Sequence, residues 1–258
     1  MDVADGSLID KKLLIEGLGK GLRILECFNE ETFRLTATEA GERAGLTRTA
    51  ARRYLLSLVH YGYAGTDGKH YWLLPKVLRL GHGYIQSNRL SRLVQPFLQR
   101  FSGETGETAN FSVLDGHEVV YLFRSNSPRV LSIGFHTGAR MVAHCSSAGY
   151  AMLSQWPDAD LEVWIEEHEF IKLNHLTLTG KNDFRLQVQA CRASGYAYVD
   201  QYANVGLSGI AVPLMDGKGK CVGALSTTFQ NLVYPGDEFR RVLLPRLQAT
   251  AEALRSLV

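Results

Sequence analysis

The first regular pattern of apolar residues along the chain begins at Gly17. In the segment GLGKGLRILECF, apolar side chains recur every three or four positions, which is the spacing of an amphipathic helix. The positions concerned are Leu18, Leu22, Leu25 and Phe28. Residues 1–16 are polar at first and turn apolar only near their end, so we expect a flexible tail before this helix.

Two short helices joined by a tight turn are predicted next, in LTATEAGERAGL and the residues that follow it. Thr36 or Thr38 can cap the first helix, and Glu39 stands three residues after Thr36, in the order of a capping box. Gly45 is suited to end that helix, and Thr47 is suited to cap the next one. Two helices separated by so short a turn form a helix-turn-helix.

The second helix of this motif, from Arg48 to about Tyr61, has two different sides on a helical wheel. Its apolar side holds Ala51, Tyr54, Leu55 and Leu58, and its polar side holds Thr49, Arg52 and Arg53, with Arg48 at the flank. The N-terminal part of such a helix contacts base edges in DNA-bound helix-turn-helix proteins. The pattern therefore predicts a DNA-reading helix with an arginine-rich face.

A hairpin is predicted directly after this helix. In YAGTDGKHYWLL, two β-rich runs flank Asp67-Gly68, a strong short-range signal for a tight turn. Lys69 and His70 stand near its tip, where they can reach a phosphate or the minor groove. Together these elements predict a winged helix-turn-helix domain at residues 17–76.

The remainder of the chain predicts a linker and an α/β (α+β) domain. Residues 77–103 are expected to form a linker helix, with breaks near Gly81-His82-Gly83 and at Pro96. From residue 104 the hairpin signals at Asp115-Gly116 and Gly217–Gly219 predict a largely antiparallel sheet. Its strands are expected in TANFSVLD, EVVYLFRS, RVLSIGF, YAYVD, LSGIAVPLMD and CVGALSTTF. Helices are expected at Ser146–Trp156, Asp160–Glu169, around Asp183–Ala193, and at Asp237–Val258.

Charge supports the DNA-binding interpretation locally rather than globally. The 258 residues carry a net charge of only +2, which requires no anionic partner. The segment from Arg43 to Arg79, however, contains seven Lys and Arg residues and a single acidic residue, Asp67. Such a local excess is the electrostatic signature of a phosphate-binding surface.

Other kinds of site receive little support. The four cysteines form no CxxC pair, and Glu166–Glu169 are consecutive helical residues that point in different directions, so we expect no metal and no cofactor. The first residues, MDVADGSLIDKKLL, lack the apolar core of a signal peptide, and no apolar run approaches the ~18 residues of a membrane span. We therefore expect a soluble, cytoplasmic protein with no membrane partner.

From Gly17 to Val258 the chain resembles the IclR family of bacterial transcription regulators. The stretches that carry the resemblance are GLGKGLRILECF, GLTRTAARRYLLSLVHYGY, YWLLPKVLRLGHGY, AHCSSAGYAML and GYAYVDQYANVGLSGIAVPLMDGKGKCVGALS. It looks most like the branch that controls aromatic-acid catabolism through protocatechuate or p-hydroxybenzoate. The resemblance implies a winged helix-turn-helix domain, a linker helix and a GAF-like effector domain at residues 104–258. It also implies a homodimer, or a dimer of dimers, on a palindromic operator in double-stranded DNA.

Two sets of site residues follow. The DNA-binding set is Thr36, Thr38, Thr47, Arg48, Thr49, Arg52, Arg53, Lys69 and His70. The family resemblance implies an effector pocket between the sheet and the helix that begins near Ser147; its matching positions are Ser147, Ala148, Val199, Asp200, Gly209, Ser226 and Thr228, with His144 preceding the helix. The chain departs from the family pattern at Tyr150, where a basic residue is usual, and also at Gln201-Tyr202 and Ser208-Gly209.

Basic residues around the predicted sheet could also neutralise an acidic effector, although most such side chains are simply solvated. They are Arg124, Arg129, His136 and Arg140, besides His144. Cys145 has no assignable base, so it is not expected to be a nucleophile.

We therefore expect a ligand-responsive, sequence-specific DNA-binding regulator without catalytic activity, which binds a small aromatic carboxylate. Two alternatives stay open. One is an enzyme acting on an aromatic acid, for which no acid–base or nucleophile constellation is found. The other is a DNA-binding protein with no effector.

Overall fold

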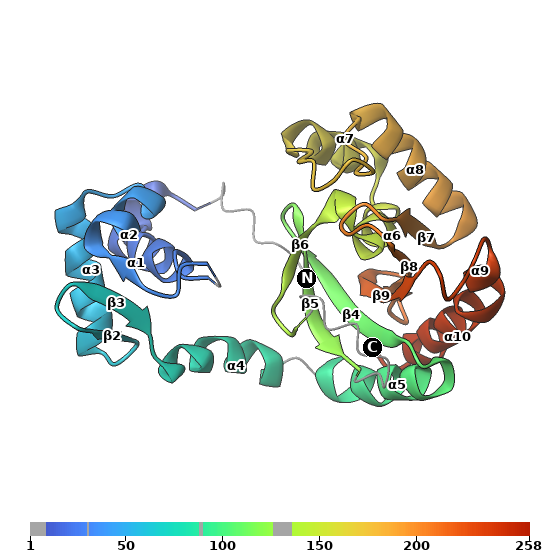
Figure 1. Ribbon diagram of the computed structural model, residues 1–258, viewed down its shortest axis with the longest axis horizontal. Helices are drawn as coiled ribbons and strands as arrows, with labels where there is room; N and C mark the ends of the chain where they lie inside the picture. Colours follow the sequence, from blue (N-terminus) through green and yellow to red (C-terminus); the bar gives the residue numbers. More distant parts are fainter. Residues whose placement is uncertain (1–8, 30, 88–89, 126–135) are drawn as a thin grey trace. The chain divides into compact units, whose positions relative to one another are not determined.

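The computed structural model describes residues 9–29, 31–87, 90–125 and 136–258 (Figure 1). The chain divides into two compact units, residues 1–87 and 88–258. Each unit has its own set of packed elements, and each is described here by itself.

The first unit is a winged helix-turn-helix. Its elements are a 3₁₀ turn at Lys11–Leu13, α1 (Glu16–Glu26), β1 (Leu35–Thr36), α2 (Ala37–Ala44), α3 (Arg48–His60), β2 (Ala64–Thr66), β3 (His70–Leu73), a 3₁₀ turn at Pro75–Val77 and α4 (Leu78–Ser87). The predicted hairpin is β2 and β3, and β1 adds a third antiparallel strand beside β3 that the sequence did not reveal.

Helix α1 forms as predicted, but only part of the apolar pattern enters the core: Phe28, just after the helix, packs against the buried cluster. Leu18 and Leu22 are 64% and 46% exposed, whereas Ile24 and Cys27 are buried with Ala40, Ala51 and Leu55. The helix carries apolar residues on more than one side, and docking against α2 and α3 selects the side that contains Ile24. Leu18 and Leu22 are left at the surface.

Helices α4 and α5 (Leu90–Thr105) account for the predicted linker, but neither breaks where expected. Helix α4 passes through Gly81, His82 and Gly83, and α5 contains Pro96 in its first half. Helix α5 packs against β4, β5 and α10 of the second unit. Because these contacts stabilise α5 along its length, one missing amide donor at Pro96 does not end it.

The second unit is built on a six-stranded antiparallel sheet in the order β6-β5-β4-β9-β8-β7. Its strands are β4 (Thr108–Asp115), β5 (Glu118–Arg124), β6 (Arg140–Val142), β7 (Ala197–Asp200), β8 (Leu207–Met215) and β9 (Cys221–Gln230). The expected antiparallel α+β architecture is therefore confirmed. The strand predicted at RVLSIGF, and with it Arg129, lies outside the described residues.

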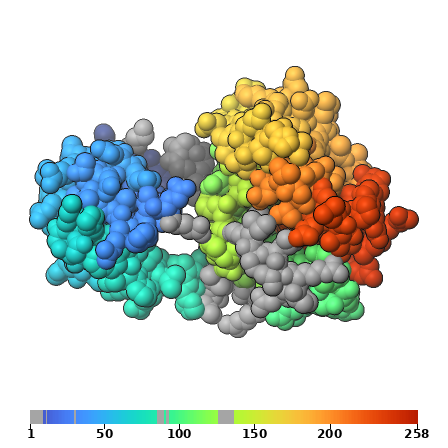
Figure 2. All heavy atoms as spheres, viewed as in Figure 1, coloured from blue at the N-terminus to red at the C-terminus, as the bar shows by residue number. Residues whose placement is uncertain are grey.

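Helices cover both faces of this sheet (Figure 1). One face carries α5 and α10 (Leu244–Arg255); the other carries α6 (Ser147–Leu153), with α7 (Asp158–Glu167) and α8 (Lys181–Ser194) outside it. In Figure 2 the yellow and gold atoms of α7, α8 and the segment between them form one continuous layer of the second unit. The single closing helix expected at 237–258 is two helices, α9 (Glu238–Val242) and α10, which meet at Leu243 just before Pro245.

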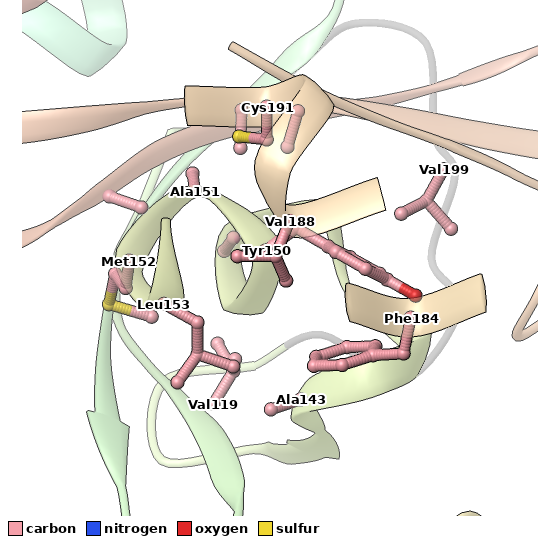
Figure 3. Packing of buried hydrophobic residues seen from close by; sticks show 14 of the residues in the cluster. Val119, Ala143, Tyr150, Ala151, Met152, Leu153, Phe184, Val188, Cys191 and Val199 are labelled. Atoms are coloured by element: carbon pink, nitrogen blue, oxygen red, sulfur yellow. The ribbon is translucent and has the colours of Figure 1, made fainter. Parts of the chain in front are cut away.

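The core between α6 and the sheet is made of small residues on the strands and large ones on the helices. Ala211 and Ala224 lie under α6, while Tyr150, Leu153 and Phe184 fill the space between α6 and α8 (Figure 3). A Cβ atom added to Gly149 would lie 2.2 Å from the carbonyl oxygen of Ala143. A glycine is therefore required there for the helix to start so close to the preceding turn.

Candidate nucleic-acid interface and ligand pocket

The arginine-rich face of α3 is open to solvent. Arg48, Thr49, Arg52 and Arg53 are exposed, and none of the described carboxylates forms an ion pair with these arginines. On the opposite side of the helix, Ala51 and Leu55 are fully buried. The helix therefore presents uncompensated positive charge on the side that faces away from its own domain.

The turn between α2 and α3 fixes the placement of this helix. Gly45 adopts φ of 65°, a left-handed conformation that favours glycine, and Leu46 N donates to Gly41 O at 2.8 Å. A Cβ atom on Gly41 would lie 2.8 Å from Leu46 O and 3.5 Å from the Ala51 Cβ atom. Both glycines are thus needed for the close approach of the two helices.

Two threonines of the predicted DNA-binding set, Thr36 and Thr47, act as helix caps. The Thr36 hydroxyl accepts from Glu39 N at 3.3 Å, and Thr36 N donates to Glu39 Oε2 at 2.7 Å, which completes the predicted capping box. The Thr47 hydroxyl accepts from Ala50 N at 3.3 Å and remains exposed, as does Thr38. Thr47 can therefore cap α3 and still face a phosphate.

The wing tip is ordered by one carboxylate. Asp67 accepts hydrogen bonds from Lys69 N at 2.9 Å and His70 N at 2.7 Å, and these bonds hold the pKa of its carboxyl well below the usual range. The His70 ring lies 3.2 Å from the same carboxylate. The Lys69 side chain is exposed, so its ammonium group is accessible to a phosphate.

The second unit contains a pocket between the sheet and the start of α6. Strand pairing brings Val199, Gly209 and Thr228 side by side on β7, β8 and β9, and Ser226 follows two residues from Thr228 on the same face. Among the described residues, those that line it are Tyr121, Met141, Cys145, Ser146, Ser147, Val199, Tyr202, Ala203, Asn204, Leu207, Ser208, Gly209, Ser226 and Thr228. Five of the predicted effector residues therefore meet in one cavity: Ser147, Val199, Gly209, Ser226 and Thr228.

Three predicted effector residues lie elsewhere. Ala148 is fully buried against the sheet, and Asp200 is exposed at the end of β7, where it accepts from Ser208 Oγ at 2.6 Å and Asn231 Nδ2 at 3.0 Å. Asp200 follows Val199 on the strand, so its side chain points to the other face of the sheet. His144 is buried and contacts His168 instead of the pocket.

Several pocket residues could not be found from the sequence motif. Tyr121 and Met141 come from β5 and β6, while Tyr202, Ala203 and Asn204 come from the turn between β7 and β8. Tyr121 is buried on β5, and this burial raises its pKa to about 12, which keeps the phenol protonated.

The turn that carries Tyr202 is held by the segment after α7. Asn174 Nδ2 donates to Gln201 O at 2.9 Å and to Tyr202 O at 3.1 Å, and the Thr177 hydroxyl donates to Tyr202 O at 2.7 Å. Gln201 adopts φ of 62°, and its side chain accepts from Gly206 N at 2.7 Å. One wall of the pocket therefore depends on hydrogen bonds made outside it.

The remaining candidates do not form a charged or catalytic centre in the pocket. Arg140 pairs with Asp115 and Glu118, each at 2.6 Å, and His136 is exposed. Arg124 is half-buried on β5 and is absent from the pocket lining. Burial raises the pKa of the Cys145 thiol to about 12, which suppresses the nucleophilic thiolate.

The described residues show neither a metal-binding cluster nor a membrane-spanning helix. No group of three or more His, Cys, Asp or Glu side chains among them is placed to hold a metal ion. None of their helices is both long enough and apolar enough to cross a membrane.

Both units match known family models. Residues 17–68 match the IclR helix-turn-helix domain, and residues 82–256 match the bacterial transcriptional regulator IclR C-terminal model. The chain is 39% identical over 251 residues to the p-hydroxybenzoate hydroxylase transcriptional activator of Acinetobacter baylyi, covering 95% of this chain and 92% of that protein. It is 34% identical over 238 residues to the Pca regulon regulatory protein of Pseudomonas putida, covering 92% and 82%.

Solved structures show the same architecture. A putative transcriptional regulator, RHA06195, from Rhodococcus sp. RHA1 is 31% identical with a TM-score of 0.80, covering 94% of this chain and 97% of that one. A double mutant of the PobR inducer-binding domain from Acinetobacter, in complex with 3-hydroxybenzoic acid, is 32% identical with a TM-score of 0.63. That match covers 66% of this chain and all of the other.

Proposed function

The chain belongs to the IclR family of bacterial transcriptional regulators, and from this premise we propose that the first unit binds DNA and the second binds a ligand. Helix α3 binds the major groove of a specific operator, and the pocket of the second unit binds a small aromatic carboxylate. The ligand changes the affinity for DNA at an operon of aromatic-acid catabolism. Such control requires that the ligand bind one arrangement of the protein more tightly than another.

The DNA-binding part of the proposal rests on one observation. Arg48, Arg52 and Arg53 form an exposed basic face without described carboxylate partners, on a helix whose other side is docked in the domain core. Arginine bound to guanine O6 and N7 is the commonest specific base contact and contributes about 1–3 kcal/mol of discrimination. Lys69 and Thr47 then serve as phosphate contacts, which fix the register of the protein on the duplex.

The ligand-binding part rests on the chemistry of the pocket lining. Hydroxyl groups of Ser146, Ser147, Ser208, Ser226 and Thr228 surround a space whose other walls include Met141, Val199 and Leu207. A flat apolar ring with a carboxylate fits this combination, because hydroxyls can donate to the carboxylate while the ring contacts the apolar walls. Relatives that regulate p-hydroxybenzoate and Pca genes support the same class of ligand.

We also propose that two copies of the chain act together on a palindromic operator. Three exposed leucines follow one another at four-residue spacing: Leu14, two residues before α1, and Leu18 and Leu22 within it. Their side chains are 51%, 64% and 46% exposed. Such a stripe occupies one side of a helix and is unfavourable in water. A second copy of the chain covers it, which gives the dimer two DNA-reading helices.

The test is fluorescence anisotropy of the full-length protein with DNA from upstream of its own gene and with random DNA of equal length. Tight, selective binding is expected, and Arg52→Ala should weaken binding by about 1–3 kcal/mol and relax selectivity. Arg241→Ala, which removes an exposed arginine from the second unit, is the matched control and should change little. Equal binding to both DNAs would favour a non-specific DNA protein.

The ligand arm of the test measures thermal unfolding with protocatechuate or p-hydroxybenzoate. A ligand at 100 times its Kd should add about 2.7 kcal/mol to the free energy of unfolding. Turnover of either acid would instead support the enzyme alternative.

A further inference from the structure

The hydroxyl of Tyr150 is buried without a hydrogen-bond partner. Tyr150 is fully buried on α6, and its ring packs against Phe184 of α8 with ring centroids 4.7 Å apart. No described donor or acceptor lies within hydrogen-bonding distance of its OH atom. Leaving a buried hydroxyl unpaired costs free energy, so such a group in a native core calls for an explanation.

The unpaired hydroxyl lies behind the inner wall of the ligand pocket. Figure 3 shows the hydroxyl end of Tyr150 turned toward Val199 and away from Cys191. Besides burial, the neighbouring Tyr202 and Cys145 help to raise the pKa of Tyr150 well above its ordinary value. Val199, Tyr202 and Cys145 all line the pocket. The hydroxyl thus faces the pocket lining from the core side.

The neighbouring tyrosine shows that pairing is possible in this region. Tyr202 OH donates to Gln187 Oε1 at 3.0 Å, so its hydrogen-bonding capacity is used within the protein. Thr227 Oγ1 is also buried and unpaired, but Thr227 stands between Ser226 and Thr228 on β9 and therefore points to the other face of the sheet. Of these three hydroxyls, only that of Tyr150 is both unpaired and directed at the pocket.

We propose that the Tyr150 hydroxyl recognises a hydroxyl substituent on the ring of the aromatic acid, and so selects hydroxylated over unsubstituted or methylated ligands. This inference rests on the proposed function, in which the pocket binds an aromatic carboxylate. A neutral phenol can both donate to and accept from a ligand hydroxyl. An ionised carboxylate would be costly at this end, because Tyr150 packs in a cluster of buried apolar side chains.

The polarity of the pocket then orients the ligand. The carboxylate faces the serine hydroxyls of residues 146 and 147, and the ring hydroxyl faces Tyr150 past Cys145 and Val199.

The experiment is isothermal titration of the full-length protein with matched ligand pairs: 4-hydroxybenzoate with 4-methylbenzoate, and 3-hydroxybenzoate with 3-methylbenzoate. A methyl group has nearly the shape of a hydroxyl but makes no hydrogen bond. The unsubstituted protein should prefer the hydroxyl compound in at least one pair. Tyr150→Phe should weaken binding of that hydroxyl compound by about 5- to 10-fold while leaving its methyl partner unchanged, as loss of one neutral hydrogen bond requires.

Thr227→Val is the matched control, since it also removes a buried unpaired hydroxyl, and it should leave the preference intact. An equal loss for both members of a pair in Tyr150→Phe would assign Tyr150 a purely structural role and overturn the inference. So would an unchanged preference, although the proposed function would stand because the ligands still bind. If the unsubstituted protein bound none of the four acids, the ligand class in the proposed function would fall together with the inference.

Discussion

The Nδ1 atom of His144 lies 2.7 Å from the Nε2 atom of His168, and this buried contact joins the turn before α6 to the end of α7. His144 Nε2 lies 2.9 Å from the carbonyl oxygen of Ile171, which can only accept, so Nε2 carries the proton. Neutral His144 must then accept at Nδ1 from His168. His168 accepts in turn from His117 Nδ1 at 3.1 Å.

This chain of three histidine rings predicts acid sensitivity through His168. Burial, and then the neighbouring His144 and His117, lower the pKa of His168 to about 4, against an ordinary value of 6.5. A depressed folded-state pKa means that the unfolded chain binds the proton first. The contribution of neutral His168 to the free energy of unfolding is complete above about pH 6.5 and is lost as the pH falls toward 4.

Urea unfolding at pH 7.5, 6 and 5 measures this effect. His168→Gln should lower stability at pH 7.5 and flatten the loss between pH 7.5 and 5. His60→Gln, at an exposed position at the end of α3, serves as the control and should keep the pH dependence of the unsubstituted protein. If the stability of His168→Gln fell with pH as steeply as that of the unsubstituted protein, the acid sensitivity could not be assigned to His168.

Gly41→Ala should destabilise the first unit by about 1–3 kcal/mol, because its Cβ atom would meet the backbone at Leu46 O. Gly19→Ala is the matched substitution, since nothing lies within 4 Å of the Cβ position on α1. There alanine should stabilise by up to about 1 kcal/mol through its higher helix propensity. Urea midpoints measure both, and equal effects would refute the close-packing argument.

Asn174→Ala should weaken ligand binding although Asn174 does not line the pocket. It removes the two side-chain hydrogen bonds that hold the carbonyls of Gln201 and Tyr202, each contributing about 0.5–1.5 kcal/mol. Titration with p-hydroxybenzoate measures the change in Kd. Asn182→Ala on the exposed surface of α8 is the control, and a similar loss in both variants would show that the effect is not local.

Leu18→Glu should convert the proposed dimer into a monomer or shift the equilibrium strongly toward it, because a charge replaces the centre of the leucine stripe on α1. Leu186→Glu changes an equally exposed leucine on α8, 63% exposed against 64%, and should leave the assembly unchanged. Sedimentation velocity distinguishes the two. Dimers that persist in Leu18→Glu would place the contact between copies elsewhere.

Local sequence signals were sufficient to predict much of the fold of the first unit. The capping box of Thr36 and Glu39, the left-handed turn at Gly45 and the hairpin at Asp67-Gly68 each depend on a few adjacent residues, so the winged helix-turn-helix could be predicted from the sequence. Tertiary contacts decided the cases in which local signals conflicted. Helix α5 continues through Pro96 because α10 and the sheet hold it, and Ile24 rather than Leu18 enters the core.

The sequence by itself determined the basic face of α3, because helical periodicity separates Arg52 and Arg53 from the apolar side of the helix without reference to the rest of the chain. Only the tertiary structure decided which side chains form the pocket and the histidine chain. Strand pairing sets Val199, Gly209 and Thr228 side by side, and chain folding brings His117, His144 and His168 into contact. Residues far apart in sequence leave no local periodic signal of their meeting, since their contacts are fixed by the packing of whole elements.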